Sequence, residues 1–363
     1  MKKIYYFDYL RIIALISVVF MHTVAGRLRM DIDKGWHILN FLTSFAFSAV
    51  PLFFMISGYL LLNNKRTLDL KVLKNRLKRL FIPLMSWSIV IAFWLNFINK
   101  GDIKSLIAMF SNLLRYAIMP HLWFMYVLIP IYILSPFLYS ALNFLDSNGK
   151  KYLFYLIVLI FINSIFKIVI PHLNIEILTN LSNIDFLNKI NFFGGHLATF
   201  FLGYYLGNID KKFSNIKLII ISIIDVLIIA MGTYYLVIKT GSYDQNLYIN
   251  FQDQSAGFEV LLASNIFLLF KQNFNKNYRI NEILSSFVAL SFPIYIIHNL
   301  IISIFYYFGF SFVRIINIFS ITFLNLFISY IILYLISYNK YLCFLFTGID
   351  YEKLCQIKKV NSK

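Results

Sequence analysis

Two ionisable side chains lie inside the first hydrophobic segment of the chain, which runs from Ile4 to Ala25. Arg11 and His22 are eleven residues apart, and on an α-helix that spacing puts both on nearly the same face, roughly 16 Å apart along the axis. Asp8 precedes Arg11 by three residues and lies within helical reach of its guanidinium. Ionisable groups in a membrane helix are costly and usually functional. We therefore expect Arg11 to act as a charge anchor and His22 as a proton acceptor.

The composition indicates an integral membrane protein. Hydrophobic residues make up 60% of the chain and charged residues 13%, which excludes a water-soluble core. The net charge of +17 favours anionic lipid headgroups and an anionic cytoplasmic ligand, whereas nucleic-acid binding does not fit so apolar a chain. No signal-peptide cleavage pattern is present, because Arg11 interrupts the first segment and Arg27 and Arg29 follow it. We expect that segment to remain as a membrane helix.

The hydrophobic segments predict an all-α, polytopic fold with about ten transmembrane helices. When the N-terminus is placed inside, 22 of the 33 lysines and arginines fall on the cytoplasmic side, which predicts that both termini are cytoplasmic. We expect one transmembrane domain over residues 1–340 and a short basic cytoplasmic tail over residues 341–363. The predicted helices are Ile4–Ala25, His37–Leu62, Leu80–Ile98, Leu122–Leu145, Tyr152–Pro171, Phe192–Gly207, Ile216–Ile238, Gly257–Phe270, Leu284–Phe308 and Ile315–Tyr338.

The two cysteines, Cys343 and Cys355, both lie near the C-terminal end of the sequence. Two cysteines so placed indicate neither a disulfide framework nor a metal site. We therefore expect no metal ion.

The densest basic stretch, Lys65–Arg79, has two interpretations. It satisfies the excess of positive charge expected of a cytoplasmic loop. Alternatively, Arg76 and Arg79, three residues apart, face one way if the following helix starts early, and two guanidiniums could then hold phosphates at the inner membrane surface. Pro83 is expected to kink or unwind the start of that helix.

Several polar residues in the predicted helices have both a structural and a functional interpretation. Ser57 precedes Gly58 and is either a nucleophile or part of a small-residue packing face. His121 and Trp123 lie at a predicted membrane boundary. They are interpreted either as part of an aromatic belt or as residues that stack on a substrate. His298 lies deep in a predicted helix, as a substrate contact or as a structural hydrogen-bonding residue.

Asp225 and Glu259 are acidic residues in predicted membrane helices, so each must pair, protonate or face a watery cavity. Either could orient a hydroxyl group of a substrate or relay protons in a transporter. His196 is interpreted as interfacial rather than catalytic, and Gly203 as a site of tight helix packing.

Five separated motifs, in order, make the chain resemble the membrane acyltransferase-3 family. The motifs are FDYLR at residues 7–11 with His22, FFMISGY at 53–59, NRLKRLFIP at 75–83, HLWF at 121–124 and SFPIYIIH at 291–298. Asn75 departs from the family pattern, which frequently has a further arginine there. Each motif is weak alone, and their order carries the resemblance.

The resemblance implies transfer of an acyl group, most often acetyl from acetyl-CoA, to a hydroxyl of a cell-envelope polysaccharide or lipid-linked glycan. In this interpretation His22 takes the proton of the acceptor hydroxyl. Arg11 orients the donor or stabilises negative charge on the thioester oxygen, and Arg76 and Arg79 hold the anionic end of the donor. The remaining candidate substrate-binding or supporting residues are Asp8, Ser57, His121, Trp123, Glu259 and His298.

The resemblance also sets expectations for partners and location. The expected partners are an acyl-CoA donor, a glycan or lipid-linked sugar acceptor, membrane lipids and a separate extracytoplasmic transferase that completes the reaction if this chain does not. The expected location is the cell membrane.

Two other function classes remain open. Buried charges and ten helices also suit a transporter or flippase of a glycan intermediate, and a membrane sensing or scaffold module would need neither His22 nor Arg11 for turnover. In the structural interpretation of the first helix, Asp8 and Arg11 form a buried pair and His22 bonds a neighbouring backbone carbonyl.

Overall fold

The computed structural model describes residues 4–170, 185–241, 243, 251–274 and 282–359, and side chains are not described at 185–194, 282–283 and 356–359. All the regular secondary structure of these residues is helical, and no strand occurs among them. This confirms the predicted all-α fold. The chain divides into two compact units, each made of two separate stretches. The first unit comprises Met1–Thr67 and Ser135–Tyr278, and the second comprises Leu68–Leu134 and Arg279–Lys363.

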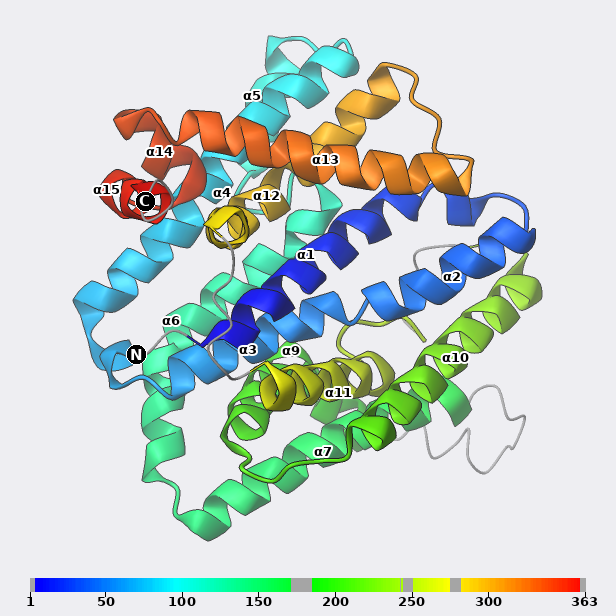
Figure 1. Cartoon of the computed structure of the whole chain (residues 1–363), viewed down its shortest axis with the longest axis vertical. Coiled ribbons are helices and arrows are strands. Elements are labelled where there is room, and N and C mark those ends of the chain that lie inside the picture. The colour runs from blue at the N-terminus through cyan, green and yellow to red at the C-terminus, as the bar shows by residue number, and fades with distance from the viewer. Residues whose placement is uncertain (1–3, 171–184, 242, 244–250, 275–281, 360–363) are drawn as a thin grey trace. The chain divides into compact units, whose positions relative to one another are not determined.

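The helices of the first unit begin with the segment that carries Arg11 and His22 (Figure 1). They are α1 (Tyr5–Val24), η1 (Arg27–Arg29), α2 (Lys34–Ala46), α3 (Ala49–Leu62), α7 (Ser147–Val169), α9 (Asp185–Asn208), α10 (Asn215–Thr240) and α11 (Gly257–Asn273).

The helices of the second unit include the long basic helix that carries Arg76 and Arg79. They are α4 (Leu70–Ile98), α5 (Ile103–Asn112), η3 (Pro120–Leu122), α12 (Glu282–Tyr307), α13 (Ile315–Ile336), α14 (Lys340–Thr347) and α15 (Tyr351–Lys359). The boundary between the units falls within helix α6 (Trp123–Phe144) and within the short turn η2 (Lys65–Leu68).

Each of the ten predicted membrane segments coincides with a helix or a helix pair. Eight spans in the described part of the chain are long and apolar enough to cross a membrane, with α2 and α3 together forming one of them. The other two predicted segments correspond to α9, which begins among undescribed side chains, and to α11, which has 17 residues. The predicted end of the fifth segment at Pro171 lies outside the described residues. The cytoplasmic location of both termini stays a prediction.

The predicted helix His37–Leu62 is wrong as a single element, because the structure breaks it at Phe47 and Ser48. Pro51 lies in the first turn of α3, and it has no N–H to donate to the carbonyl of Phe47, so a continuous helix would lose that bond. The chain therefore ends one helix and starts another.

The predicted start of the third membrane helix at Leu80 is also wrong, because α4 begins at Leu70. Asp69 caps it by accepting hydrogen bonds from the backbone N–H groups of Lys71 and Val72, at 2.8 and 3.3 Å. The helix continues through Pro83. The early start puts Arg76 and Arg79 on one helix, as their proposed joint role requires.

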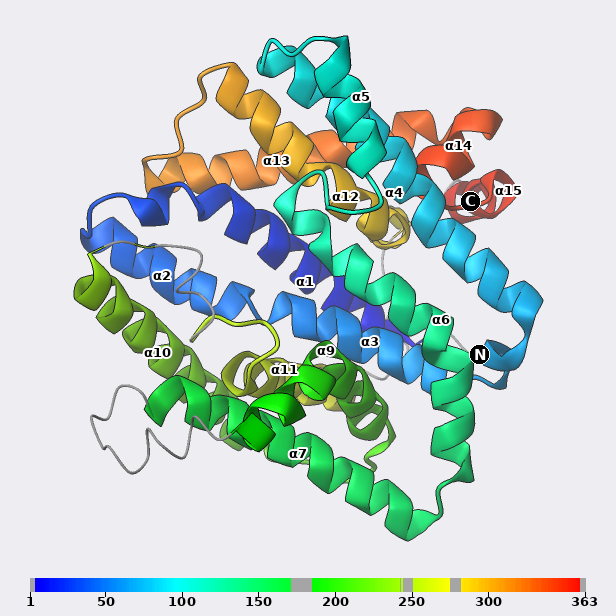
Figure 2. The ribbon, with the colours of Figure 1, turned by 180° about the vertical axis from the view of Figure 1, so that it is seen from behind.

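Helices α3 and α9 pack with their backbones in close contact, as their adjacent ribbons in Figures 1 and 2 show. A methyl group at Gly58 would lie 1.7 Å from the carbonyl oxygen of Phe200, and one at Gly203 would lie 2.1 Å from that of Met55. The two glycines thus make reciprocal contacts, one from each helix. Small residues permit such close approach between membrane helices, and Gly203 has the tight-packing role expected of it.

Candidate functional site

Helix α1 carries the first candidate group. The Arg11 guanidinium donates a hydrogen bond to Asp8 at 3.3 Å, one helical turn away. Asp8 is buried, whereas the side chain of Arg11 keeps 30% of its surface exposed. The carboxylate therefore neutralises and orients a guanidinium that a ligand can still reach. The pair predicted from the spacing is present.

His22 lies two residues before the end of α1, and part of its surface is accessible. The adjacent residues Met21 and Thr23 are buried, and Thr23 donates to the carbonyl of Val19 at 2.8 Å. His22 is therefore a partly accessible residue between two buried neighbours near the end of a regular helix. Accessibility is required of a proton acceptor.

The segment that leads into α11 contacts the end of α1. Gln254 approaches the sulfur of Met21, the residue before His22, at 3.8 Å. Asp253 accepts two hydrogen bonds at 2.8 Å, from the backbone N–H and the hydroxyl of Ser255. Burial raises the pKa of the Asp253 carboxyl, and the bonds from Ser255 act in the opposite direction. The contact of this segment with α1 could not be predicted, because nothing in a single sequence pairs residue 254 with residue 21.

Glu259 lies in the first turn of α11 and is completely buried. Asp225 of α10 and Asp253 both act on it electrostatically. Neither carboxyl oxygen of Glu259, nor Oδ2 of Asp225, has a hydrogen-bond partner among the described residues. Two other acidic groups thus act on this carboxyl, while the partial positive charge of the α11 N-terminus favours its ionised form.

His196 of α9 stacks on the ring of Phe54 of α3, with centroids 4.6 Å apart and an interplanar angle of 16°. The preceding residue, Gly195, faces Ser255, whose Cβ is 3.9 Å from a methyl group placed at the glycine. His196 therefore lies near the segment that contacts Met21. This stacking on Phe54 was not predicted from the sequence, which indicated an interfacial, non-catalytic His196.

In the second unit, Arg79 pairs with Asp350 through a hydrogen bond of 2.5 Å, and both side chains are exposed in part. The pair forms one side of a pocket of about 310 Å³. The other lining residues are Asn75, Lys78, Ile82 and Phe344. Arg76, one turn earlier on α4, is partly buried and interacts electrostatically with Tyr132. The pocket is cationic and already contains one carboxylate.

His121 and His298 form a buried polar cluster in the second unit, with ring centroids 4.7 Å apart. Asn299 donates to Nδ1 of His121 at 2.9 Å, so the ring proton lies on Nε2, which donates to the carbonyl of Ile296 at 3.0 Å. His298 donates through Nδ1 to the carbonyl of Tyr295 at 2.5 Å. The two bonds of His121 join η3 to α12, and the bond of His298, of the structural kind considered for it, lies within α12.

The other two candidates are Ser57 and Trp123. Ser57 is part-exposed on α3, next to the glycine that contacts α9. Trp123 is part-exposed at the first residue of α6, beside Phe124. The structure thus distributes the candidates between the units. Those in the first unit are Asp8, Arg11, His22, Ser57 and Glu259, and those in the second are Arg76, Arg79, His121, Trp123 and His298.

One family model, described as an acyltransferase domain, matches residues 4–334. The match covers all five motifs and confirms the resemblance seen in them. No curated protein and no solved structure matches the chain.

Proposed function

Because the chain belongs to the acyltransferase-3 family of membrane acyltransferases, we propose that it is an O-acetyltransferase of the cell membrane. Its proposed substrates are acetyl-CoA and a hydroxyl group of a cell-envelope polysaccharide or lipid-linked glycan. The observation that carries the proposal is the joint presence on α1 of a part-exposed His22 and of an accessible Arg11 held by Asp8.

His22 is proposed as the general base. A neutral imidazole, with an ordinary pKa of about 6.5, accepts a proton near neutral pH. His22 takes the proton of the acceptor hydroxyl while the oxygen forms an ester bond to the acetyl carbon. It returns that proton to sulfur as the carbon–sulfur bond breaks, so the imidazole ends in its starting state.

Arg11 is proposed to stabilise negative charge. A guanidinium stays protonated at every physiological pH, so it acts as a donor of hydrogen bonds and not as a base. The bond to Asp8 fixes its position before the substrate arrives, and a preoriented charge costs no reorganisation during the reaction. The exposed part of the side chain is available to the thioester oxygen.

The α4 pocket is proposed to hold the phosphates of acetyl-CoA. Lys78, Arg79 and the nearby Arg76 supply the cationic groups that phosphates require. Asp350 competes for Arg79 in the absence of ligand. Since exposed ion pairs contribute only about 0–1 kcal/mol, a multiply charged phosphate can displace the carboxylate.

Labelled acetyl-CoA tests the proposed reaction. We expect His22→Ala to lower acetyl incorporation into glycan by about 100-fold or more, the loss typical of a missing general base. His37→Ala is the matched control, because His37 is an exposed histidine of the same unit, and it should retain full activity. Both variants are checked for folding by thermal unfolding in detergent. Equal activity in the folded His22→Ala protein would overturn the assignment.

The acceptor is tested by chemical analysis of surface glycans from cells with and without the gene. The proposal expects an ester-linked acetyl group to be missing from the deleted strain, and to return with the wild-type gene but not with His22→Ala.

A transporter or flippase of a glycan intermediate is the second candidate function. The buried carboxyls of Glu259 and Asp225 favour it, since acidic groups inside a membrane protein can relay protons. Movement of the glycan intermediate across the membrane without acetyl incorporation would support this function and contradict the transferase.

A further inference from the structure

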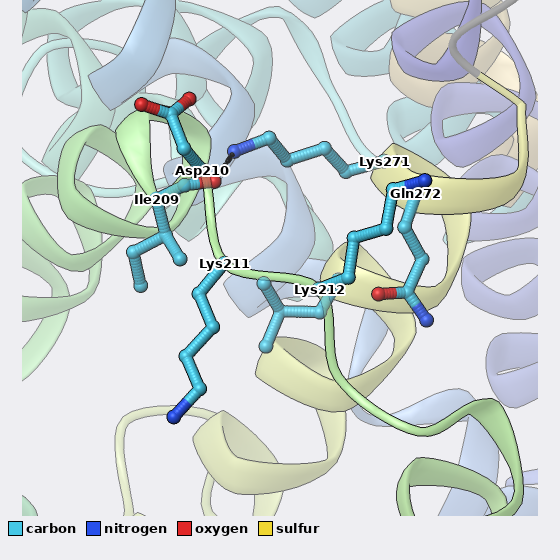
Figure 3. Close-up of a pocket in the computed structure, with 7 residues that line it drawn as sticks. Ile209, Asp210, Lys211, Lys212, Lys271 and Gln272 are labelled. Atoms are coloured by element: carbon cyan, nitrogen blue, oxygen red, sulfur yellow. Dashed lines mark hydrogen bonds between the residues drawn. The ribbon is translucent and has the colours of Figure 1, made fainter.

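A second cationic pocket lies in the first unit, and none of the residues that line it is used in the proposed reaction. It is formed by the connection between α9 and α10 and by the last turn of α11 (Figure 3). Its volume is about 310 Å³, at the lower end of the range for small-molecule sites. Asp210, Lys211 and Lys212 line it from the connection, and Leu268, Lys271 and Gln272 line it from α11.

The wall of this pocket is held in place by hydrogen bonds from two consecutive residues of α11. Lys271 donates through Nζ to the carbonyls of Leu206 and Ile209, at 3.0 and 2.5 Å. The Gln272 amide accepts from the backbone N–H of Phe213 at 3.2 Å and donates to its carbonyl at 3.1 Å. The connection is therefore fixed to the helix on both sides of Lys211 and Lys212.

The charge of the pocket is positive. Three lysines, Lys211, Lys212 and Lys271, and one acidic residue, Asp210, are among the lining residues, which gives them a formal charge of +2. The carboxylate of Asp210 acts electrostatically on Lys271. Lys271 uses two of its three N–H groups on backbone carbonyls, so one remains for a ligand. Lys212 extends toward Gln272 and Lys211 extends away from it, over the ring of Phe213 at 5.9 Å (Figure 3).

We propose that this pocket binds a phosphomonoester dianion, carried by an anionic lipid headgroup or by a soluble phosphate compound. Lysine ammoniums recognise phosphate as point charges, and two net positive charges match a dianion. The excess of lysine expected in cytoplasmic loops explains positive charges in this connection. It does not explain why these lysines line a pocket, or why the Lys271 ammonium is fixed by two backbone carbonyls. The site is independent of the proposed acetyl transfer.

Calorimetric titration of the full chain in uncharged detergent with inorganic phosphate tests the site. Lys212→Gln removes an exposed charge from the pocket, and Lys151→Gln removes an equally exposed charge from α7 in the same unit. We expect Lys212→Gln to weaken binding about tenfold, equivalent to 1.4 kcal/mol, and Lys151→Gln to leave it unchanged. Equal weakening by both variants would show a diffuse charge effect and overturn the proposal.

The lipid source is tested by native mass spectrometry after reconstitution in phosphatidylcholine with or without phosphatidic acid. Retention of phosphatidic acid by the wild type and the Lys151→Gln protein, but not by Lys212→Gln, supports a headgroup site. Saturable binding of inorganic phosphate that Lys212→Gln weakens supports a soluble ligand. If neither probe binds selectively, the proposal fails, and because both readouts are binding, that failure leaves the acetyltransferase proposal untouched.

Discussion

Glu259 is completely buried, and the described part of the chain offers no hydrogen bond to either of its carboxyl oxygens. Two further acidic groups, Asp225 and Asp253, act on it. A buried polar group without a partner keeps its desolvation cost. Residues that cost stability in this way are commonly retained for function.

We expect Glu259→Met to raise the free energy of unfolding by roughly 1–3 kcal/mol, because the uncompensated polar group is removed. The thermal midpoint in detergent should rise accordingly. Glu352→Met on α15 is the control, since Glu352 is exposed and its replacement should leave the midpoint unchanged. A lower midpoint for Glu259→Met would show that the carboxyl is stabilised by groups that the geometry does not reveal.

At the residue scale, side-chain contacts within one helical turn could be predicted from the sequence. The Asp8–Arg11 pair follows from a spacing of three residues. The contacts of Gln254 with Met21 and of His121 with Asn299 could not be predicted, because residues far apart in sequence meet only through tertiary packing.

At the scale of single elements, the contact between α3 and α9 depends on the absence of a side chain at Gly58. We expect Gly58→Ala to destabilise the protein by about 2–3 kcal/mol, because the added methyl would overlap the Phe200 carbonyl and one helix would have to move. Gly149→Ala in α7 is the control, since its methyl would meet only side-chain atoms, of Leu145 and Asp146, at 3.0–3.2 Å, and no backbone of another helix. Thermal unfolding of both variants tests this, and equal midpoints would contradict it.

The start of α2 depends on Asp33, which accepts a hydrogen bond from the Trp36 N–H at 2.7 Å and pairs with Arg27 at 2.6 Å. The Trp36 N–H and then the Arg27 guanidinium hold the pKa of the Asp33 carboxyl below its usual value. A carboxyl whose folded pKa is lowered contributes stability above its unfolded pKa, and that contribution is lost as pH falls through the folded value.

Asp33→Asn keeps a capping oxygen but removes the charge. We therefore expect the variant to have a lower thermal midpoint than the wild type at pH 7, and the difference to shrink progressively below about pH 4, the ordinary range of an aspartate. A difference that stays constant down to pH 2.5 would contradict the role of the charge.

The elements themselves were largely predictable, because long apolar segments can only be helices in a membrane. The errors occurred where local chemistry competes with hydropathy. Pro51 divides one apolar segment into two helices, and Asp69 starts α4 within a basic stretch that hydropathy assigns to a loop. No local sequence pattern indicated that α3 would pack against α9.

At the scale of the whole molecule, the excess of lysine and arginine predicts a cytoplasmic C-terminus. The chain has two cysteines, of which Cys343 is buried and Cys355 is partly exposed on α15. We expect a membrane-impermeant maleimide to label Cys355 in inside-out vesicles but not in intact cells. Cys355→Ser should abolish the labelling, and labelling of the wild type in intact cells would contradict the predicted orientation.

Each compact unit combines an early and a late stretch of the chain. The second unit receives Leu68–Leu134 and then Arg279–Lys363, with a long stretch of the first unit between them. Hydropathy predicts the order of helices along the sequence but not which of them associate, so a division of this kind could not be derived from the apolar segments.

The reciprocal glycine contact also has a consequence for biosynthesis. Gly203 follows Gly58 by roughly 145 residues, which a ribosome adding about 5–20 residues per second needs roughly 7–30 s to make. Throughout that delay the side of α3 that carries Gly58 contacts lipid or the insertion machinery instead of α9. Ribosomal pausing or truncation before α9 emerges would leave this face uncovered and available to quality-control proteases.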